Sequence, residues 1–253
     1  MILDLFKLDN QVAVVTGGRR GLGRAIAQGL AEAGANVVSV SRNGNANETR
    51  KRVEQAGRRF LDLQIDLGKP DARKGLIDKV VEKMGRIDIL VNNAGNAYRH
   101  LPEEFPEEDW RNLLEVHLNA AFDLSQQAGK QMLKQGRGKI INMGSLMSFE
   151  GGWQIAAYAA AKHGIAGLTK SLATSWSHRG INVNCIAPGY FETELAGPLK
   201  DDPIRGPQIL DRIPAGRWGA PEEIAGLAVF LASAASNYMH GSVVLIDGGW
   251  RAR

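Results

Sequence analysis

The 253-residue sequence has a single cysteine, and it shows no secretory signal peptide and no apolar run long enough to span a bilayer. One cysteine cannot form a disulfide within the chain, so Cys185, in the apolar run INVNCIAPG, is expected to be a buried thiol. Linkers rich in proline and serine, internal repeats and low-complexity segments are also absent. We therefore expect a cytoplasmic protein with no membrane partner, folded as a single domain over residues 1–253.

Charge of one sign is not concentrated anywhere in the chain. The formal net charge is +4 and the isoelectric point about 9.2, but the basic residues are scattered. Runs such as RKRVEQAGRR fit the solvated face of a helix, which leaves nucleic-acid binding as the weaker interpretation. We expect a small-molecule substrate, no nucleic-acid partner and no metal site.

Strand-like and helix-like patterns alternate from end to end, which is typical of an α/β fold. Within INMGSLMSFEGGWQIAAYAAAKHG, the run KIINM predicts a buried strand ending just before Ser145, and the residues from Ala156 onward predict a helix. Tyr158 and Lys162 are four residues apart and therefore share one helix face. An ammonium group beside a phenol is expected to lower the tyrosine pKa, so that Tyr158 can pass a proton, while Ser145 holds a substrate oxygen. Alternatively, both residues only decorate an amphipathic helix.

A glycine-rich turn follows the first predicted strand, Gln11 to Thr16. A glycine-rich turn between a strand and a helix lets the backbone approach a pyrophosphate at the positive end of the helix dipole. A tight connection without a ligand is the alternative. The residues of this turn that are expected to contact a nucleotide are Gly17, Arg19, Arg20, Gly21, Leu22 and Gly23.

The next predicted strand, NVVSVS, ends at Ser41 and Arg42 without an acidic residue. Sites that select NAD usually place an acid at this strand end, whereas arginine accommodates the 2′-phosphate of NADP. Arg20 and Arg42 therefore favour NADP(H), with NAD(H) as a possible cofactor, unless both are ordinary surface arginines.

Two later strand ends complete the predicted nucleotide cleft. Asp66, with Leu67 beside it, closes the strand RRFLDLQID and could accept a hydrogen bond from the adenine amino group or cap the following helix. The strand ILV runs into Asn92 and then into a small polar turn that is expected to lie alongside the nucleotide or only to reverse the chain. This turn consists of Asn93, Ala94 and Gly95.

Taken in order, TGGRRGLG, NNAG, Ser145 with YAAAK, and PGYFET resemble the short-chain dehydrogenase/reductase superfamily over essentially the whole chain. The resemblance implies a Rossmann-type, doubly wound, seven-stranded parallel sheet with helices on both faces. It also implies hydride transfer between nicotinamide and a carbonyl or alcohol, with Ser145, Tyr158 and Lys162 as catalytic residues.

The resemblance further implies roles for the last third of the chain. The turn at Pro188 and Gly189 and the hydroxyl of Thr193 would meet the nicotinamide carboxamide, and residues 190–213 would form a lid over the substrate. The helix from Pro221 to about Ala232 and the strand SVVLIDGG would pack across a dyad and give a homotetramer.

One residue departs from the family pattern. Members commonly carry asparagine five residues before a phenylalanine in the helix expected from about Glu107 to Gln135, and counting back from Phe122 gives His117. Asn119 cannot replace it from the same face, because two residues turn a helix by about 200°. We hypothesise that His117 holds a water in the proton relay to Lys162.

The segments ILDRIPAGRWG, LMSFEGG and IDGGWRAR resemble the branch that contains 2-deoxy-D-gluconate 3-dehydrogenase and gluconate 5-dehydrogenase. This favours a keto sugar acid or similar small polyol as substrate. A 3-oxoacyl thioester reductase or broad carbonyl reductase is one alternative, and a non-catalytic nucleotide-sensing protein is another. Candidate substrate contacts, any of which could instead be surface residues, are Arg99, His100, Gln154, Tyr190 and Arg205.

Overall fold

A computed structural model describes residues 1–252 of the chain. Seven parallel strands form one sheet in the order β3-β2-β1-β4-β5-β6-β7, which confirms the predicted Rossmann-type architecture. The strands are β1 (Val12–Thr16), β2 (Asn36–Ser41), β3 (Phe60–Gln64), β4 (Ile89–Asn92), β5 (Gly138–Met143), β6 (Ile181–Pro188) and β7 (Val243–Ile246).

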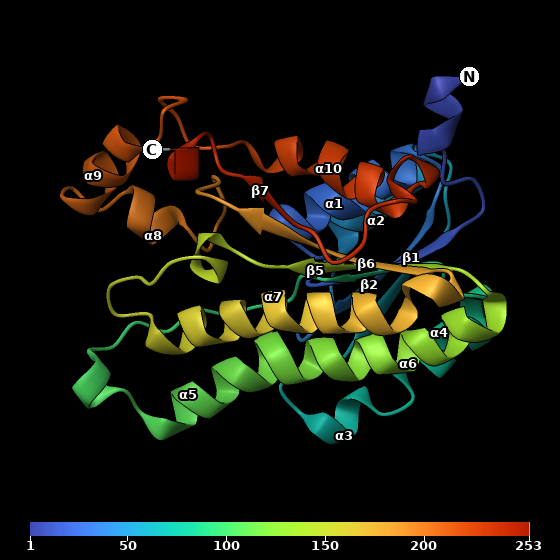
Figure 1. The fold of residues 1–253 in the computed structure, drawn as a ribbon, viewed down its shortest axis with the longest axis horizontal. Coiled ribbons are helices and arrows are strands. Elements are labelled where there is room, and N and C mark those ends of the chain that lie inside the picture. Colours follow the sequence, from blue (N-terminus) through green and yellow to red (C-terminus); the bar gives the residue numbers. More distant parts are fainter. Residues whose placement is uncertain (253) are drawn as a thin grey trace.

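Helices cover both faces of the sheet (Figure 1). One layer contains α1 (Gly21–Glu32), α2 (Asn47–Gln55) and α10 (Ala225–Ala232). The other contains α3 (Pro70–Arg73), α4 (Leu76–Met84), α5 (Glu107–Leu114), α6 (Ala120–Gln135) and α7 (Ala156–Trp176). None of the helices in residues 1–252 combines the length and the apolar character needed to cross a bilayer.

Successive residues of each strand face opposite layers, as the pleat requires. Val15 and Val91 pack into the core beneath α1 and α10, whereas Val14 and Leu90 pack into the core beneath α4 and α6. Because both faces are covered, the strands read as continuous apolar runs.

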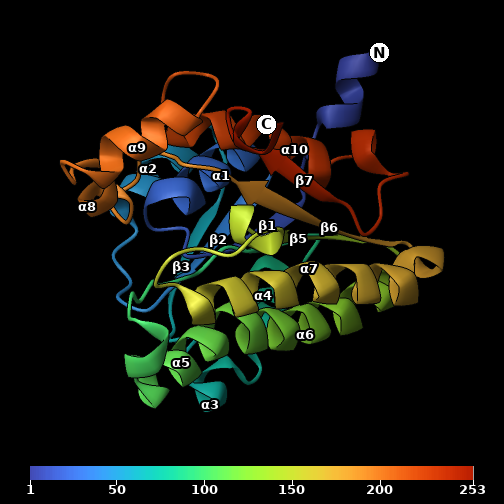
Figure 2. The same cartoon turned by 60° about the vertical axis from the view of Figure 1, so that its left-hand side comes forward.

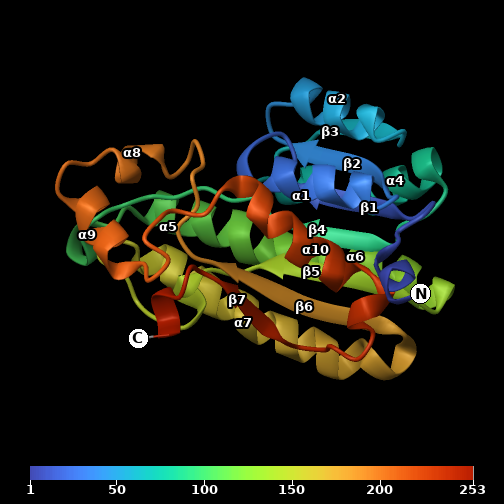
Figure 3. The same ribbon diagram turned by 90° about the horizontal axis from the view of Figure 1, so that it is seen from above.

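The carboxyl ends of the parallel strands lie at one edge of the sheet, and the strand order reverses between β1 and β4 at that edge. Ligands of open α/β sheets bind at such a switch point. The helices α8 (Gly197–Lys200) and α9 (Arg205–Arg212), together with the last described segment Trp250–Ala252, lie beyond the same edge (Figures 2 and 3).

Three element boundaries differ from the prediction. Helix α1 begins at Gly21, inside the glycine-rich turn, because glycine can supply the backbone N–H groups of a first helical turn without a side chain. β3 ends at Gln64, so Asp66 lies in the following turn and does not close the strand. The predicted long helix is interrupted between α5 and α6 by a π-helical segment, η3 (Glu115–Asn119), which contains His117.

Candidate active site

The structure brings Ser145, Tyr158 and Lys162 together at the ends of β5 and α7. Lys162 is buried, with 5% of its surface exposed, and its Nζ donates a 2.6 Å hydrogen bond to the carbonyl oxygen of Met143. The same Nζ lies 5.4 Å from the centre of the Tyr158 ring. The predicted juxtaposition is therefore present.

Ser148, which the sequence interpretation missed, ties the serine turn to the helix. Its hydroxyl donates to the carbonyl oxygen of Lys162 at 2.9 Å and accepts the backbone N–H of Ser145 at 3.2 Å. The available signal was the repeated serine in SLMS, at the spacing that lets a side chain bond back to the start of a helical turn.

The expected lowering of the tyrosine pKa is wrong for this structure. Burial raises the pKa of Tyr158, and hydrogen bonding with Ser145 and the charge of Arg99 offset this only in part. The ammonium of Lys162 is directed to the Met143 carbonyl oxygen instead of the phenol oxygen. Burial also lowers the pKa of Lys162 to about 8.

His117 is buried and packs its ring edge against Tyr158, with ring centres 5.4 Å apart and planes at 82°. Its Nε2 lies 3.0 Å from the backbone nitrogen and 2.8 Å from the carbonyl oxygen of Asn96, while its Nδ1 is buried and has no partner among residues 1–252. Burial and then the charge of Lys162 lower the His117 pKa to about 3, so the ring is neutral at physiological pH. Asn119 instead bonds Glu115 at the surface.

The glycine-rich turn is packed too tightly for side chains. A Cβ on Gly23 would lie 2.2 Å from the Gly17 carbonyl oxygen, and Gly17 itself has a φ of 67°. Asn93 braces the turn by donating from Nδ2 to the carbonyl oxygen of Thr16 at 2.8 Å. The Thr16 hydroxyl, another residue missed at the sequence level, accepts the backbone N–H groups of Asn93 and Ala94 at 2.8 and 2.9 Å. These hydrogen bonds join the carboxyl end of β1 to the turn that follows β4.

The two arginines predicted to bind a 2′-phosphate differ in their surroundings. Arg42 is exposed at the end of β2 and forms no ion pair within residues 1–252, and the Ser41 hydroxyl beside it is buried without a partner. Arg20 precedes α1 and pairs with Glu194 at 2.7 Å, with both side chains about half exposed. Glu194 therefore competes with any anion for Arg20.

The remaining predicted cofactor contacts lie along the same strand edge. Asp66 accepts the backbone N–H of Gly68 at 3.0 Å within the turn after β3 and does not cap the following helix, whose N-cap residue is Lys69; Leu67 is buried. Thr193 approaches Gly21, where an added Cβ would lie 3.6 Å from its methyl group. The rest are Arg19 and Leu22 in the glycine-rich turn, Gly95 after β4, and Pro188 and Gly189 at the end of β6.

These features fit a dinucleotide. The N-terminus of α1 has no side-chain cap, its first residue Gly21 has no side chain to cover the backbone, and Arg42 supplies a cation without an ion-pair partner within residues 1–252. A phosphate at the end of β2 would also meet the unsatisfied Ser41 hydroxyl.

Basic and aromatic side chains gather on the substrate side of Tyr158. Arg99 extends from the loop after β4 and forms no ion pair with any described residue; its pKa is lowered, first by partial burial and then by the charge of Arg205. The Arg205 guanidinium lies over the Trp153 ring at 5.3 Å. Burial raises the pKa of Tyr190, and the charges of Arg99, Arg205 and Arg212 oppose this rise, whereas Glu150 adds to it.

Two candidate substrate contacts are placed differently. The His100 side chain points to α5, where Nε2 lies 2.7 Å from a carboxylate oxygen of Asp109. Gln154 has a φ of 61°, and its carbonyl oxygen accepts the His100 backbone N–H at 3.1 Å. Sequence alone could not separate these residues from Arg99, because all three lie in irregular segments.

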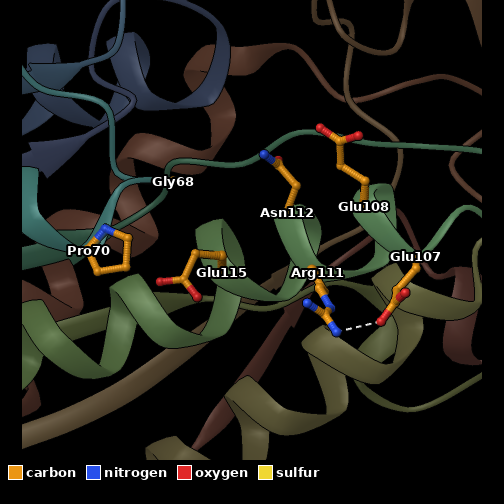
Figure 4. Close-up of a pocket in the computed structure, with 7 residues that line it drawn as sticks. All are labelled: Gly68, Pro70, Glu107, Glu108, Arg111, Asn112 and Glu115. Atoms are coloured by element: carbon orange, nitrogen blue, oxygen red, sulfur yellow. Dashed lines mark hydrogen bonds and ion pairs between the residues drawn. The ribbon is translucent and has the colours of Figure 1, made fainter.

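A cavity of about 480 Å³ lies between the turn after β3 and α5 (Figure 4), and it borders the predicted site, because its lining residue Gly68 bonds Asp66 and its lining residue Asn112 bonds Asn96. Arg111 there is paired with Glu107, and Glu115 is paired with Arg73. The surplus of carboxylates would repel phosphate or a sugar acid. Its lining residues are Gly68, Pro70, Glu107, Glu108, Arg111, Asn112 and Glu115.

A family model described as enoyl-(acyl carrier protein) reductase matches residues 17–251. The 2-dehydro-3-deoxy-D-gluconate 5-dehydrogenase of Bacillus subtilis is 50% identical over 250 residues, covering 99% of this chain and 98% of that protein. The Escherichia coli enzyme of the same name is 47% identical, covering 100% of both. The crystal structure of a gluconate 5-dehydrogenase from Burkholderia cenocepacia, in complex with NADP and tartrate, has a TM-score of 0.94 and 40% identity, with 100% of both chains covered. Similarity of this extent shows that the chain belongs to the short-chain dehydrogenase/reductase family.

Proposed function

We propose that the protein is an NADP(H)-preferring oxidoreductase that interconverts a carbonyl and a secondary alcohol of a sugar acid or similar small polyol. The observation that carries the substrate class is Arg99, which forms no ion pair within residues 1–252 and whose charge acts on Arg205, Tyr158 and Tyr190, while the Arg205 guanidinium lies over the Trp153 ring. Two guanidinium groups at the mouth of a site suit a carboxylate, which they can bind by charge-assisted hydrogen bonds. The tartrate bound to the Burkholderia cenocepacia relative is a hydroxylated carboxylate as well.

A bound nicotinamide cofactor supplies or accepts the hydride in this reaction. In reduction, Tyr158 donates its proton to the carbonyl oxygen while the Ser145 hydroxyl holds that oxygen in place. The raised pKa of Tyr158 suits this direction, because the phenol is protonated at neutral pH. Lys162, with a pKa near 8, can give and take a proton close to neutrality and resupplies the tyrosine.

His117 contributes to proton delivery through Nδ1. This nitrogen is buried, lacks a partner among the described residues and belongs to a ring packed against Tyr158. A buried water bonded there would satisfy it and would extend the relay from Lys162.

Cofactor binding rests on the glycine-rich turn for the pyrophosphate and on Arg20 and Arg42 for the 2′-phosphate. Asp66 and Leu67 would hold the adenine, Asn93, Ala94 and Gly95 would line the cleft, and Pro188, Gly189 and Thr193 would hold the nicotinamide carboxamide. The lid, residues 190–213, closes over the substrate.

The protein is proposed to act in the cytoplasm as a homotetramer of single-domain chains. Two separate surfaces support self-association. Phe122 on α6 is 43% exposed, and Leu245 on the edge strand β7 is 38% exposed.

A substrate panel tests the proposal. Keto sugar acids, neutral ketoses, simple ketones and a 3-oxoacyl thioester are offered with NADPH and with NADH, and cofactor oxidation is followed. Keto sugar acids with NADPH are expected to give the highest kcat/KM. The thioester is included because the matching family model is named for acyl chemistry. A preference for the thioester would overturn the sugar-acid assignment, and no oxidation with any substrate would favour a nucleotide-sensing role.

A further inference from the structure

The segment from Asn93 to Leu101 lies between β4 and the short helix Pro102–Glu104 and contains no helix or strand. The exposure of its side chains nevertheless alternates, as it does in a strand. Gly95, Ala97 and Arg99 are exposed, while the residues between them are partly buried. An extended segment displays every second side chain on one side. The exposed side carries Arg99, which the proposed function assigns to the substrate carboxylate.

The inward-facing residues are each bonded to α5 or to the π-helical segment η3 that continues it. Asn96 Nδ2 donates to Asn112 Oδ1 at 2.9 Å, and the His100 ring bonds Asp109 at 2.7 Å. Tyr98 places its hydroxyl 3.4 Å from the same Asn112 oxygen. Such ties fix both ends of the extended segment, on either side of Arg99.

The strongest tie is made by His117, because it holds main-chain atoms. Its Nε2 lies within hydrogen-bonding distance of both the N–H and the carbonyl oxygen of Asn96, at 3.0 and 2.8 Å. The ring also packs against Gly95 so closely that an added Cβ there would lie 2.4 Å from Cε1. At the same time the ring touches Tyr158 edge-on. A single side chain thus sets the distance between the backbone that carries Arg99 and the tyrosine.

We propose that His117, through Nε2, is a positioning residue for substrate recognition, holding the Gly95–Leu101 segment so that Arg99 meets the substrate carboxylate while the carbonyl reaches Tyr158. Asp109 acts in the same way through His100. This inference rests on the proposed function and adds a second role to His117, distinct from the relay role of Nδ1.

Substitution of His117 can separate the positioning role of Nε2 from the relay role of Nδ1. A glutamine amide reaches about as far as Nε2 of histidine, whereas an asparagine amide reaches about as far as Nδ1. His117→Gln should therefore keep the KM for a keto sugar acid, and His117→Asn and His117→Ala should raise it by about tenfold to a hundredfold, the usual cost of a misplacement of about 1 Å. Relay function predicts the opposite ranking for kcat, with asparagine preserving it best.

Three comparisons exclude a merely structural effect. First, the KM for a neutral ketose, which has no carboxylate for Arg99, should change by less than about threefold in the His117 variants, because loss of the relay lowers kcat and leaves this KM alone. Second, Arg99→Ala and Arg99→Ala/His117→Ala should have the same KM for the acid, because the second change removes support for a group already lost. Third, NADPH affinity should stay the same.

Asp109→Ala provides a second test, because it removes the hydrogen-bond partner of the His100 ring and leaves the buried His117 ring in place; Asp109 itself is 29% exposed. This variant should also raise the KM for the keto sugar acid. His163→Ala is the matched control, since His163 is exposed on α7 and bonds only the Ala159 carbonyl oxygen of its own helix. That variant should retain the wild-type constants.

The outcomes are distinguishable. If the unmodified protein reduces no carboxylate substrate, or if Arg99→Ala leaves KM unchanged, the proposed carboxylate site fails and the positioning role fails with it. If Arg99→Ala raises KM but His117→Asn keeps the wild-type value, or if the losses of Arg99 and His117 are additive, only the positioning role is overturned.

Discussion

At the scale of single residues, burial raises the pKa of Tyr158, so its phenol is protonated at neutral pH. Replacing it with phenylalanine keeps the ring contacts with His117 but removes the transferable proton, so turnover should fall by about 10²–10⁴-fold. NADPH affinity, measured by fluorescence titration, should stay within about threefold because the ring remains. Tyr238→Phe, at a fully exposed tyrosine, is the control. Near-normal turnover of the Tyr158 variant would remove the residue from the catalytic step.

Burial of the Lys162 ammonium destabilises the folded state, so its removal should raise the free energy of unfolding. A pKa lowered from 10.5 to about 8 corresponds to roughly 3 kcal/mol of destabilisation at neutral pH. Below pH 8 both the folded and unfolded states bind the proton, and the whole cost is present. Between pH 8 and 10.5 only the unfolded state keeps it, so the free energy of unfolding rises with pH.

We therefore expect Lys162→Met to unfold at higher denaturant concentration than the wild type at pH 7, while losing turnover. The gain in the free energy of unfolding is reduced because Lys162→Met leaves the Met143 carbonyl oxygen without its hydrogen bond. The gain should also shrink towards pH 10, where Lys162 of the folded wild type is already neutral. Denaturant titrations from pH 6 to 10 measure it, with the exposed Lys170→Met as control. A difference independent of pH would contradict burial of the charge as the cause.

Residue types and spacing were enough to predict which groups meet, but not their ionisation. Tyr158 and Lys162 share a helix face, as four-residue spacing requires. The pKa of Tyr158 is raised because the phenol is buried, and Lys162 Nζ does not offset the rise, since it donates its hydrogen bond to the Met143 carbonyl oxygen. Neither can be read from spacing, because both depend on the turn after β5 and on Ser148, which ties that turn to α7.

At the scale of elements, the end of β2 determines cofactor choice. Arg42 is unpaired there and no acid is present, so NADPH should be preferred over NADH by more than about tenfold if one charged hydrogen bond contributes roughly 1.5–3 kcal/mol. Arg42→Asp should erase or reverse the preference in kcat/KM, because the new carboxylate repels the 2′-phosphate and can bond ribose hydroxyls.

Arg179→Asp is the control for this change in charge. Arg179 is also exposed, but it precedes β6 at the opposite edge of the sheet. Its replacement should leave the ratio of kcat/KM for NADPH and NADH unchanged. Equal use of both cofactors by the unmodified protein would show that Arg42 and Arg20 are surface residues, with Arg20 occupied by Glu194.

Elements were predicted well where periodicity is regular and poorly where it is interrupted. The strand Asn36–Ser41 and the start of α7 were predicted correctly, because apolar runs and helix formers define them. The π-helical segment Glu115–Asn119 was missed, since one extra residue in a turn does not disturb an amphipathic pattern enough to be seen. His100 could not be told apart from Arg99 for a similar reason: alternation within an irregular loop is not visible before its bond to Asp109 of α5 is known.

At the scale of the whole molecule, two apolar surfaces lie on different sides of the sheet. Figures 1 and 2 show α6 and α7 side by side as one outer layer, and β7 with α10 lies on the other side. Helix α10 is apolar around its whole circumference, and β7 is the last strand of the sheet, with one unpaired edge. An all-apolar helix is expected to be covered, and an unpaired edge invites association.

Two independent self-complementary surfaces generate a closed tetramer with dihedral symmetry. Light scattering of the unmodified protein at micromolar concentration should therefore give the mass of four chains. Phe122→Glu should break contacts through α6, and Leu245→Arg contacts through β7, so each change alone should leave dimers and both together monomers. Lys51→Glu, at an exposed position of α2 and therefore outside α6, α10 and β7, should remain tetrameric. A monomeric wild type, or a double variant that keeps the tetramer mass, would show that these surfaces do not mediate assembly.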